Sequence, residues 1–212
     1  AWFAKGKFYW EYDNGERDAI QCLSNAIALD SKFEPAWFVK AEALASLGRH
    51  EESLKCYDEA IALLPTDAKE KRYDEHGRYY FFDRWAGKAD LLSELGKHEE
   101  AIKCYDKALE MVGRDEGHHV FGQKGITLAK LGKHEESIKC YDEALKRMGY
   151  RSDDSLPKIN LAKADALSEL GEGVSDETSM FKCYSSAIRF YTDKLFDDKH
   201  KPVVDIDDWE EG

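Results

Sequence analysis

Three histidines open the same short phrase, His-Glu-Glu, and each could begin a metal site. Zinc proteases place two histidines four residues apart on one face of a helix, so that both rings reach the same ion. Here the fourth residue after each histidine is Leu54, Ile102 or Ile138. The second ligand is missing each time, and a packing role in a turn is the better interpretation. The phrases begin at His50, His98 and His134.

The adjacent pair His118 and His119 is a second candidate for metal binding. Neighbouring side chains on a helix point about 100° apart, so these two rings would not converge on one ion. The sequence contains no phosphate-binding glycine motif and no Gly-x-Ser-x-Gly nucleophile motif. Its many carboxylates are explained by solvated helix surfaces. We therefore expect a non-enzymatic protein with no catalytic residue, no metal and no cofactor.

Five cysteines could form disulfides, but they recur at the same place in successive stretches of the chain. Equivalent helices in a stack lie about 8–10 Å apart, whereas a disulfide needs Cα atoms within about 7 Å. The odd number and the absence of any Cys-x-x-Cys motif point the same way. We expect half-buried free thiols at Cys22, Cys56, Cys104, Cys140 and Cys183.

A repeated phrase supplies the elements that position these residues. LGRHEESLKCYDEAIALLP begins at Leu47, LGKHEEAIKCYDKALEMVG at Leu95 and LGKHEESIKCYDEALKRMG at Leu131. A second phrase precedes each copy, and a fourth version of it, KADALSELG, begins at Lys163. Self-similarity at this period predicts a stack of repeated units rather than one closed core.

Each unit is predicted to be two helices joined by a tight turn. In the clearest unit, small and apolar residues at helical spacing predict a first helix over 35–47. Gly48 can take the left-handed conformation that ends it. A second helix is predicted over 51–63, and Pro65 prevents its continuation. The first helix packs through Trp37, Ala41 and Leu44, and the second through Ser53, Tyr57, Ala60 and Leu64.

This order of aromatic, small and proline positions resembles the tetratricopeptide repeat, a helix–turn–helix unit of about 34 residues. The resemblance covers about 1–188. It implies an all-α fold, a right-handed superhelical solenoid of about five units with a C-terminal capping helix. We expect repeat 1 at 1–33, repeat 2 at 34–67, an insertion at 68–81, repeat 3 at 82–117, repeat 4 at 118–152, a degenerate repeat 5 at 153–189, and an extended capping helix with an acidic tail at 190–212.

The insertion follows from the spacing of two aromatic residues, because Trp37 and Trp85 lie 48 residues apart (85 − 37). It is charged and then aromatic. One interpretation is a longer first helix in the third unit, whose aromatic residues 79–82 pack on the preceding helix. The other is a projecting contact surface for a partner. Both remain open on the sequence alone.

The charge balance limits the class of partner. The chain has 31 Lys and Arg against 43 Asp and Glu, a net charge of −12, which argues against binding nucleic-acid phosphate. No apolar run approaches the roughly 18–20 residues of a membrane span, and no signal segment opens the chain. We expect a cytoplasmic protein. Because the sequence begins inside a repeat, we also expect it to be a piece of a longer one.

In tetratricopeptide arrays, the resemblance implies, the unpacked face of each first helix lines a concave groove that binds extended peptides or helices. Here that groove would be aromatic at its N-terminal end and acidic in the middle, which favours a partner segment with apolar anchors and Lys or Arg. A receptor for chaperone tails is disfavoured, because its clamp positions keep one cation. The expected partner-binding residues are Phe3, Lys7, Trp10, Phe38, Glu42, Asp90, Ile126 and Lys130.

Three functions compete. The leading hypothesis is a protein interaction scaffold that binds a peptide or helix in the groove. The second is a regulatory or substrate-recruiting domain of a larger enzyme. The third is self-association through the open N-terminal end, where exposed aromatic side chains would mark a contact surface. These side chains are Trp2, Phe8, Tyr9, Trp10 and Tyr12.

Overall fold

The computed structural model describes residues 1–12, 15–64, 81–112, 117–148, 155–170 and 177–195, which form ten helices and no strand. The chain divides into two compact units, Ala1–Gly113 and Arg114–Gly212. The first unit contains α1 (Trp2–Tyr12), α2 (Glu16–Leu29), α3 (Glu34–Ser46), α4 (His50–Ala62), α5 (Phe82–Glu94) and α6 (His98–Met111). The second contains α7 (His118–Lys130), α8 (His134–Met148), α9 (Ser155–Glu169) and α10 (Glu177–Leu195).

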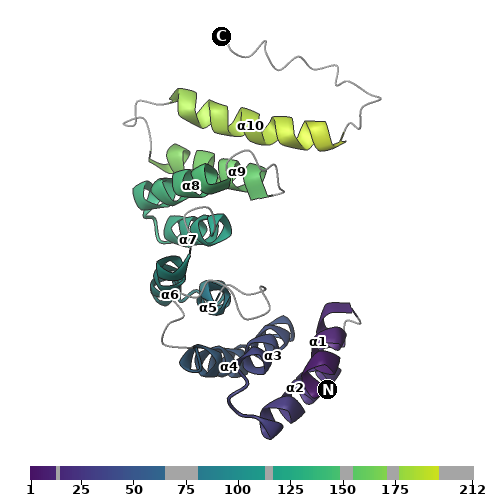
Figure 1. The fold of residues 1–212 in the computed structure, drawn as a ribbon. Coiled ribbons are helices and arrows are strands. Elements are labelled where there is room, and N and C mark those ends of the chain that lie inside the picture. The colour runs from purple at the N-terminus through teal and green to yellow at the C-terminus, as the bar shows by residue number, and fades with distance from the viewer. Residues whose placement is uncertain (13–14, 65–80, 113–116, 149–154, 171–176, 196–212) are drawn as a thin grey trace. The chain divides into compact units, whose positions relative to one another are not determined.

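Each odd-numbered helix folds back on the helix that follows it, as Figure 1 shows for the successive pairs. Within the first unit, α2 packs on α3 and α4 packs on α5; within the second, α8 packs on α9. This arrangement confirms the predicted stack of two-helix units. The helices predicted over 35–47 and 51–63 begin and end one residue earlier, as α3 and α4.

A glycine in the left-handed conformation ends the first helix of several pairs. Gly48 has a φ of 72°, and its N–H donates to the carbonyl of Ala45 at 2.9 Å. The next N–H, of Arg49, donates to the carbonyl of Leu44 at 2.9 Å. These bonds satisfy carbonyl groups that the helix end leaves open. Gly96 and Gly132 repeat the arrangement, with φ of 76° and 73°, whereas Gly171 lies outside the described residues.

The paired helices approach closely because small residues line their contact. The hydroxyl of Ser53 donates to the carbonyl of Ala41 at 2.7 Å, and that of Ser137 donates to the carbonyl of Gly125 at 2.9 Å. A Cβ atom added to Gly125 would lie 2.6 Å from Cε1 of Tyr141. The tyrosine ring therefore fills the space that a side chain would need. This explains why the fourth repeat has Gly125 at the position equivalent to Ala41.

Several predicted segments fall mostly outside the described residues. They include nearly all of the insertion at 68–81 and the acidic tail; α10 is described as far as Leu195. Phe82, the last of the aromatic residues at 79–82, is buried at the start of α5.

All five cysteines are free thiols, as predicted, and all are buried rather than half-buried. Burial raises the pKa of the thiols of Cys56 and Cys104. Low thiolate content and poor access make such thiols slow nucleophiles.

Alkylation should separate the folded from the unfolded chain. In denaturant without reductant, we expect five thiols per chain to react, because none is bridged. In native buffer the same reagent should react far more slowly, since burial limits access. Mass spectrometry of the alkylated chain measures both results. Three or fewer reactive thiols in denaturant would reveal a disulfide and contradict the prediction.

Candidate functional site

The first helices of the three pairs in the first unit lie next to one another, with α1 against α3 and α3 against α5. Equivalent positions on these helices therefore gather on one surface. We call this surface the acidic face and define it by the charged residues Lys7, Glu11, Glu42, Asp83 and Asp90, three of which the sequence predicts to bind a partner.

Two carboxyl groups of the acidic face hold protons unusually well. Burial raises the pKa of Glu42 to about 7, with Asp83 and Glu11 adding to the rise and Arg84 and Lys7 opposing it. Burial likewise raises the pKa of Asp83 to about 6, against the nearby charge of Arg84. Both groups therefore ionise close to neutral pH rather than near pH 4.

The cation beside these carboxyl groups is the guanidinium of Arg84, and it binds a different carboxylate. Arg84 donates from Nε to Oε1 of Glu34 at 2.8 Å and from Nη2 to Oε2 at 3.1 Å, and its side chain is 2% exposed. This bidentate pair joins α3 to α5. In the other four repeats the place equivalent to Arg84 holds a smaller apolar side chain: Ala1, Ala36, Val120 or Ile159. An arginine in a series of small apolar residues is the signal in the sequence that marks this ion pair.

Arg84 also explains the position of Phe38, a predicted contact residue. The guanidinium carbon lies 4.2 Å from the centre of the Phe38 ring, and the ring of Tyr57 lies 6.1 Å away. Phe38 is 9% exposed as a result. Its ring belongs to the packing between neighbouring pairs and offers little surface to a partner.

A tyrosine of the following helix holds the carboxylate of Asp90. Tyr105, on α6, donates its hydroxyl hydrogen to Oδ1 of Asp90 at 2.6 Å. The equivalent pair in the second unit is Tyr184 and Asp165, at 2.9 Å. Asp90 is therefore part of a contact within its own helix pair as well as of the acidic face.

The N-terminal end of the acidic face carries half-buried aromatic rings. Phe3 meets Phe33 edge to face with centroids 5.0 Å apart, and Trp10 packs on the same hydrophobic core. Nζ of Lys7 lies 3.3 Å from Oε1 of Glu11. The charge of Lys7 also reaches the carboxyl group of Glu42, whereas Phe3 and Trp10 pack on the hydrophobic core of the first unit.

The remaining predicted contact residues lie in the second unit. Ile126 and Lys130 are both exposed on α7. The acidic face of the first unit is built without them.

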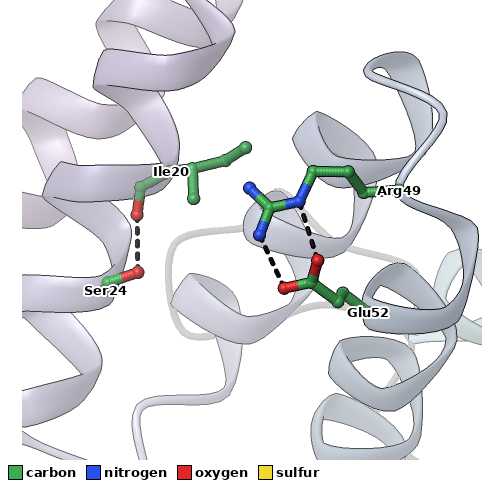
Figure 2. Close-up of polar contacts among 4 residues, drawn as sticks. All are labelled: Ile20, Ser24, Arg49 and Glu52. Atoms are coloured by element: carbon green, nitrogen blue, oxygen red, sulfur yellow. Dashed lines mark hydrogen bonds and ion pairs between the residues drawn. The ribbon is translucent and has the colours of Figure 1, made fainter.

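A different ion pair marks the turn between α3 and α4. Arg49 donates from Nε and Nη2 to the two carboxylate oxygens of Glu52 at 2.8 and 2.6 Å (Figure 2). The hydrogen bond from Arg49 lowers the pKa of Glu52. The other bond in Figure 2, from the Ser24 hydroxyl to the carbonyl of Ile20 at 2.7 Å, lies within α2. Both are local contacts and add nothing to the acidic face.

The part of the chain that the structure describes contains no group of three or more His, Cys, Asp or Glu side chains arranged to hold a metal ion. Among those residues, no helix has the length and apolar content required to cross a membrane.

Comparison with protein families agrees with this architecture. Models of the tetratricopeptide repeat match residues 35–67 and residues 84–147. The chain is a tetratricopeptide repeat protein. Its described hairpins are those of an all-α tetratricopeptide solenoid. No curated protein sequence matches the chain.

Solved tetratricopeptide structures share the fold at low sequence identity. A crystal structure of MamA matches with a TM-score of 0.71 and 10% identity, covering 96% of each chain. YrrB, described as a tetratricopeptide protein with an unusual peptide-binding site, matches with a TM-score of 0.65 and 13% identity, covering 92% of this chain and 87% of its own. Cut9, solved with Hcn1, matches with a TM-score of 0.65 and 16% identity, covering 90% of this chain and 33% of its own.

Proposed function

We propose that this tetratricopeptide protein is a non-enzymatic cytoplasmic scaffold that binds a polypeptide segment on the acidic face of its first unit. The observation that carries the proposal is the pair of carboxyl groups of Glu42 and Asp83, whose pKa values are raised to about 7 and about 6. Desolvated carboxylates are stabilised when a cation approaches them. A Lys or Arg of a partner would supply that cation.

Two aromatic rings of α1 suggest the rest of the partner. Phe3 and Trp10 are half-buried, so each keeps some surface for an apolar side chain. Aromatic rings contribute large contact areas at protein interfaces. A segment with basic residues between apolar anchors fits both features. The described peptide-binding site of YrrB, which shares the fold, supports a polypeptide partner.

The proposed contacts differ slightly from the sequence-based set. The contacts that remain are Glu42, Asp90, Lys7, Phe3 and Trp10. Asp83 is added, and Phe38 contributes through packing. Ile126 and Lys130 remain proposed contacts of the second unit. The alternative, a substrate-recruiting domain of a larger enzyme, would use the same acidic face, and nothing in its geometry favours that role over a scaffold.

The binding should strengthen as pH rises. The probe is a pair of short fluorescent peptides with identical Leu and Phe anchors, one with Lys and one with Glu between them. Below its pKa near 7, Glu42 is neutral; above it, the carboxylate attracts a cation. We expect the Lys peptide to bind at least about tenfold more tightly at pH 8 than at pH 5, and the Glu peptide to bind poorly throughout. Fluorescence anisotropy measures both.

Two variants locate the effect. Glu42→Gln should weaken binding of the Lys peptide at pH 8 and reduce the pH dependence to what Asp83 contributes. Glu59→Gln, an exposed change on α4, is the matched control and should leave both unchanged. Equal affinity and equal pH dependence in Glu42→Gln and the unaltered chain would refute the acidic face as the binding surface.

A further inference from the structure

In two repeats a tyrosine of the second helix holds a carboxylate of the first helix. The hydroxyl of Tyr105 donates to Oδ1 of Asp90 at 2.6 Å, and the hydroxyl of Tyr184 donates to Oδ1 of Asp165 at 2.9 Å. Both aspartates directly follow the alanine that packs inside the pair, so they occupy the same position of the repeat. Each tyrosine hydroxyl therefore finds its acceptor within its own helix pair.

The second repeat has the same tyrosine but a longer acidic side chain opposite it. Tyr57 is equivalent to Tyr105, and Glu42 is equivalent to Asp90. Tyr57 is 4% exposed, yet its hydroxyl makes no hydrogen bond with any residue that the structure describes. Within the same part of the chain, the carboxyl group of Glu42 receives no hydrogen bond either. Buried hydroxyl groups usually have a partner, so the missing one here points to a ligand.

The unbonded hydroxyl lies between α3 and α5, within the acidic face. A Cβ atom added to Gly87 on α5 would lie 2.7 Å from the hydroxyl oxygen of Tyr57. Burial raises the pKa of this hydroxyl, and the charges of Glu42 on α3 and Asp90 on α5 raise it further. Gly87 is only half-buried, so the tip of the tyrosine ring lies close to the surface. A ligand on the acidic face can therefore meet the donor of Tyr57 and the acceptor of Glu42 together.

The surrounding charges limit which acceptor a ligand can offer to Tyr57. A carboxylate of the ligand would be repelled by Glu42, Asp83 and Asp90. The neutral acceptor that every polypeptide carries is its main-chain carbonyl oxygen. A helix uses most of these oxygens for its own hydrogen bonds, whereas an extended segment presents them to its surroundings. The hydroxyl of Tyr57 thus favours an extended segment over a helix.

We propose that Tyr57 and Glu42 together select an extended partner segment. The hydroxyl of Tyr57 donates to a main-chain carbonyl of that segment, and the carboxylate of Glu42 accepts from a Lys or Arg beside it. This inference rests on the proposed function, which places the partner on the acidic face. The length of the Glu42 side chain keeps both groups open, because an aspartate at this position bonds its tyrosine in the third and fifth repeats.

The probe is the Lys peptide described above, made without Asn or Gln so that its neutral acceptors are main-chain carbonyls. Tyr57→Phe should weaken its binding at pH 8 about threefold to tenfold, as expected for one neutral hydrogen bond. Replacing the carbonyl oxygens of the probe by sulfur, a weaker acceptor, one at a time should reproduce this loss at one position. The same replacement should change nothing in the Tyr57→Phe chain. Fluorescence anisotropy measures each affinity.

A helical version of the probe, closed by a side-chain staple, tests the conformation of the segment. It keeps the Leu, Phe and Lys side chains but holds its carbonyl oxygens in internal hydrogen bonds. We expect it to bind more weakly than the free peptide and to be insensitive to Tyr57→Phe.

Urea denaturation of three variants tests the hydroxyl without any peptide. Tyr184→Phe is the matched control, because it removes a hydroxyl that already binds Asp165; it should lower the midpoint and leave peptide affinity unchanged. Tyr57→Phe should not lower the midpoint, since its hydroxyl is unbonded in the free chain. Glu42→Asp should recreate the tyrosine–aspartate bond, and it should therefore raise the midpoint and weaken peptide binding.

Three results would overturn the proposal. One is equal affinity of the Tyr57→Phe and unaltered chains for a Lys peptide that Glu42→Gln still weakens, which leaves the proposed function in place. Another is a midpoint lowered as much by Tyr57→Phe as by Tyr184→Phe, because the hydroxyl would then have a partner within the chain. The third is tighter binding of the stapled helix than of the free peptide. If Glu42→Gln has no effect on binding, the proposed function fails, and this inference fails with it.

Discussion

Replacing Arg84 by methionine should lower the free energy of unfolding by about 3–5 kcal/mol. The change leaves the carboxylate of Glu34 buried without the guanidinium that binds it at 2.8 and 3.1 Å. An uncompensated charge in a buried place is costly because water no longer solvates it. Urea denaturation followed by circular dichroism measures the loss, with the midpoint and slope of each transition reported, since the chain has two units.

A second variant and a control isolate the ionic part of this effect. Arg84→Met combined with Glu34→Gln should recover most of the stability, because the buried charge of Glu34 is removed together with its partner. Arg49→Met breaks the exposed pair with Glu52 and should cost far less than Arg84→Met, because solvent screens exposed charges. If Arg84→Met costs no more than Arg49→Met, the buried pair is not what joins α3 to α5.

Tyr105→Ala should destabilise the chain by about 3–5 kcal/mol, as large-to-small changes of buried aromatic residues do. Tyr105 is 1% exposed and fills the space between α5 and α6. Tyr105→Phe keeps the ring and removes only the hydrogen bond to Asp90, so it should cost about 1.5–3 kcal/mol. The same denaturation experiment measures both variants.

The control for Tyr105 is a tyrosine that the structure leaves in solvent. Tyr12→Ala should change stability by about 0.5 kcal/mol or less, since the side chain is largely exposed. A loss below about 1 kcal/mol for Tyr105→Ala would contradict its assignment to the core of the pair.

The sequence predicted the helix pairs well because their signals are local. Trp37 lies within α3 and Gly48 follows its end, so both signals act on that one helix. The bounds of α3 were therefore predicted to within one residue. The packing of Tyr57 and Tyr105 between paired helices also followed, because helical spacing alone places them on the inner stripe. Residues that act within one pair are therefore the ones that a single sequence reveals.

Contacts between pairs were harder to predict. Glu34 and Arg84 are 50 residues apart in the sequence. The insertion between them makes it hard to see which positions of the second and third repeats correspond. Helical spacing alone predicted that Phe38 is exposed. In the structure the guanidinium of Arg84 covers its ring. Helical spacing likewise predicted that the carboxylate of Asp90 has no partner within its own helix pair. In the structure the hydroxyl of Tyr105 donates a hydrogen bond to it. Each of these contacts depends on which side chain a neighbouring helix supplies, and the period of one helix does not carry that information.

Two kinds of ion pair join neighbouring helix pairs in this chain. Lysine–aspartate pairs occur twice, as Lys88 with Asp58 and Lys163 with Asp142, whereas the pair of Glu34 and Arg84 differs from them in what it implies for growth by duplication. A repeat that carries both the lysine and the aspartate can form this ion pair with a similar repeat on either side, so a new copy fits next to either neighbour. Glu34 and Arg84 form a joint with only one matching partner. A duplication that separated the second repeat from the third would break this pair, whereas a duplication elsewhere would leave it intact.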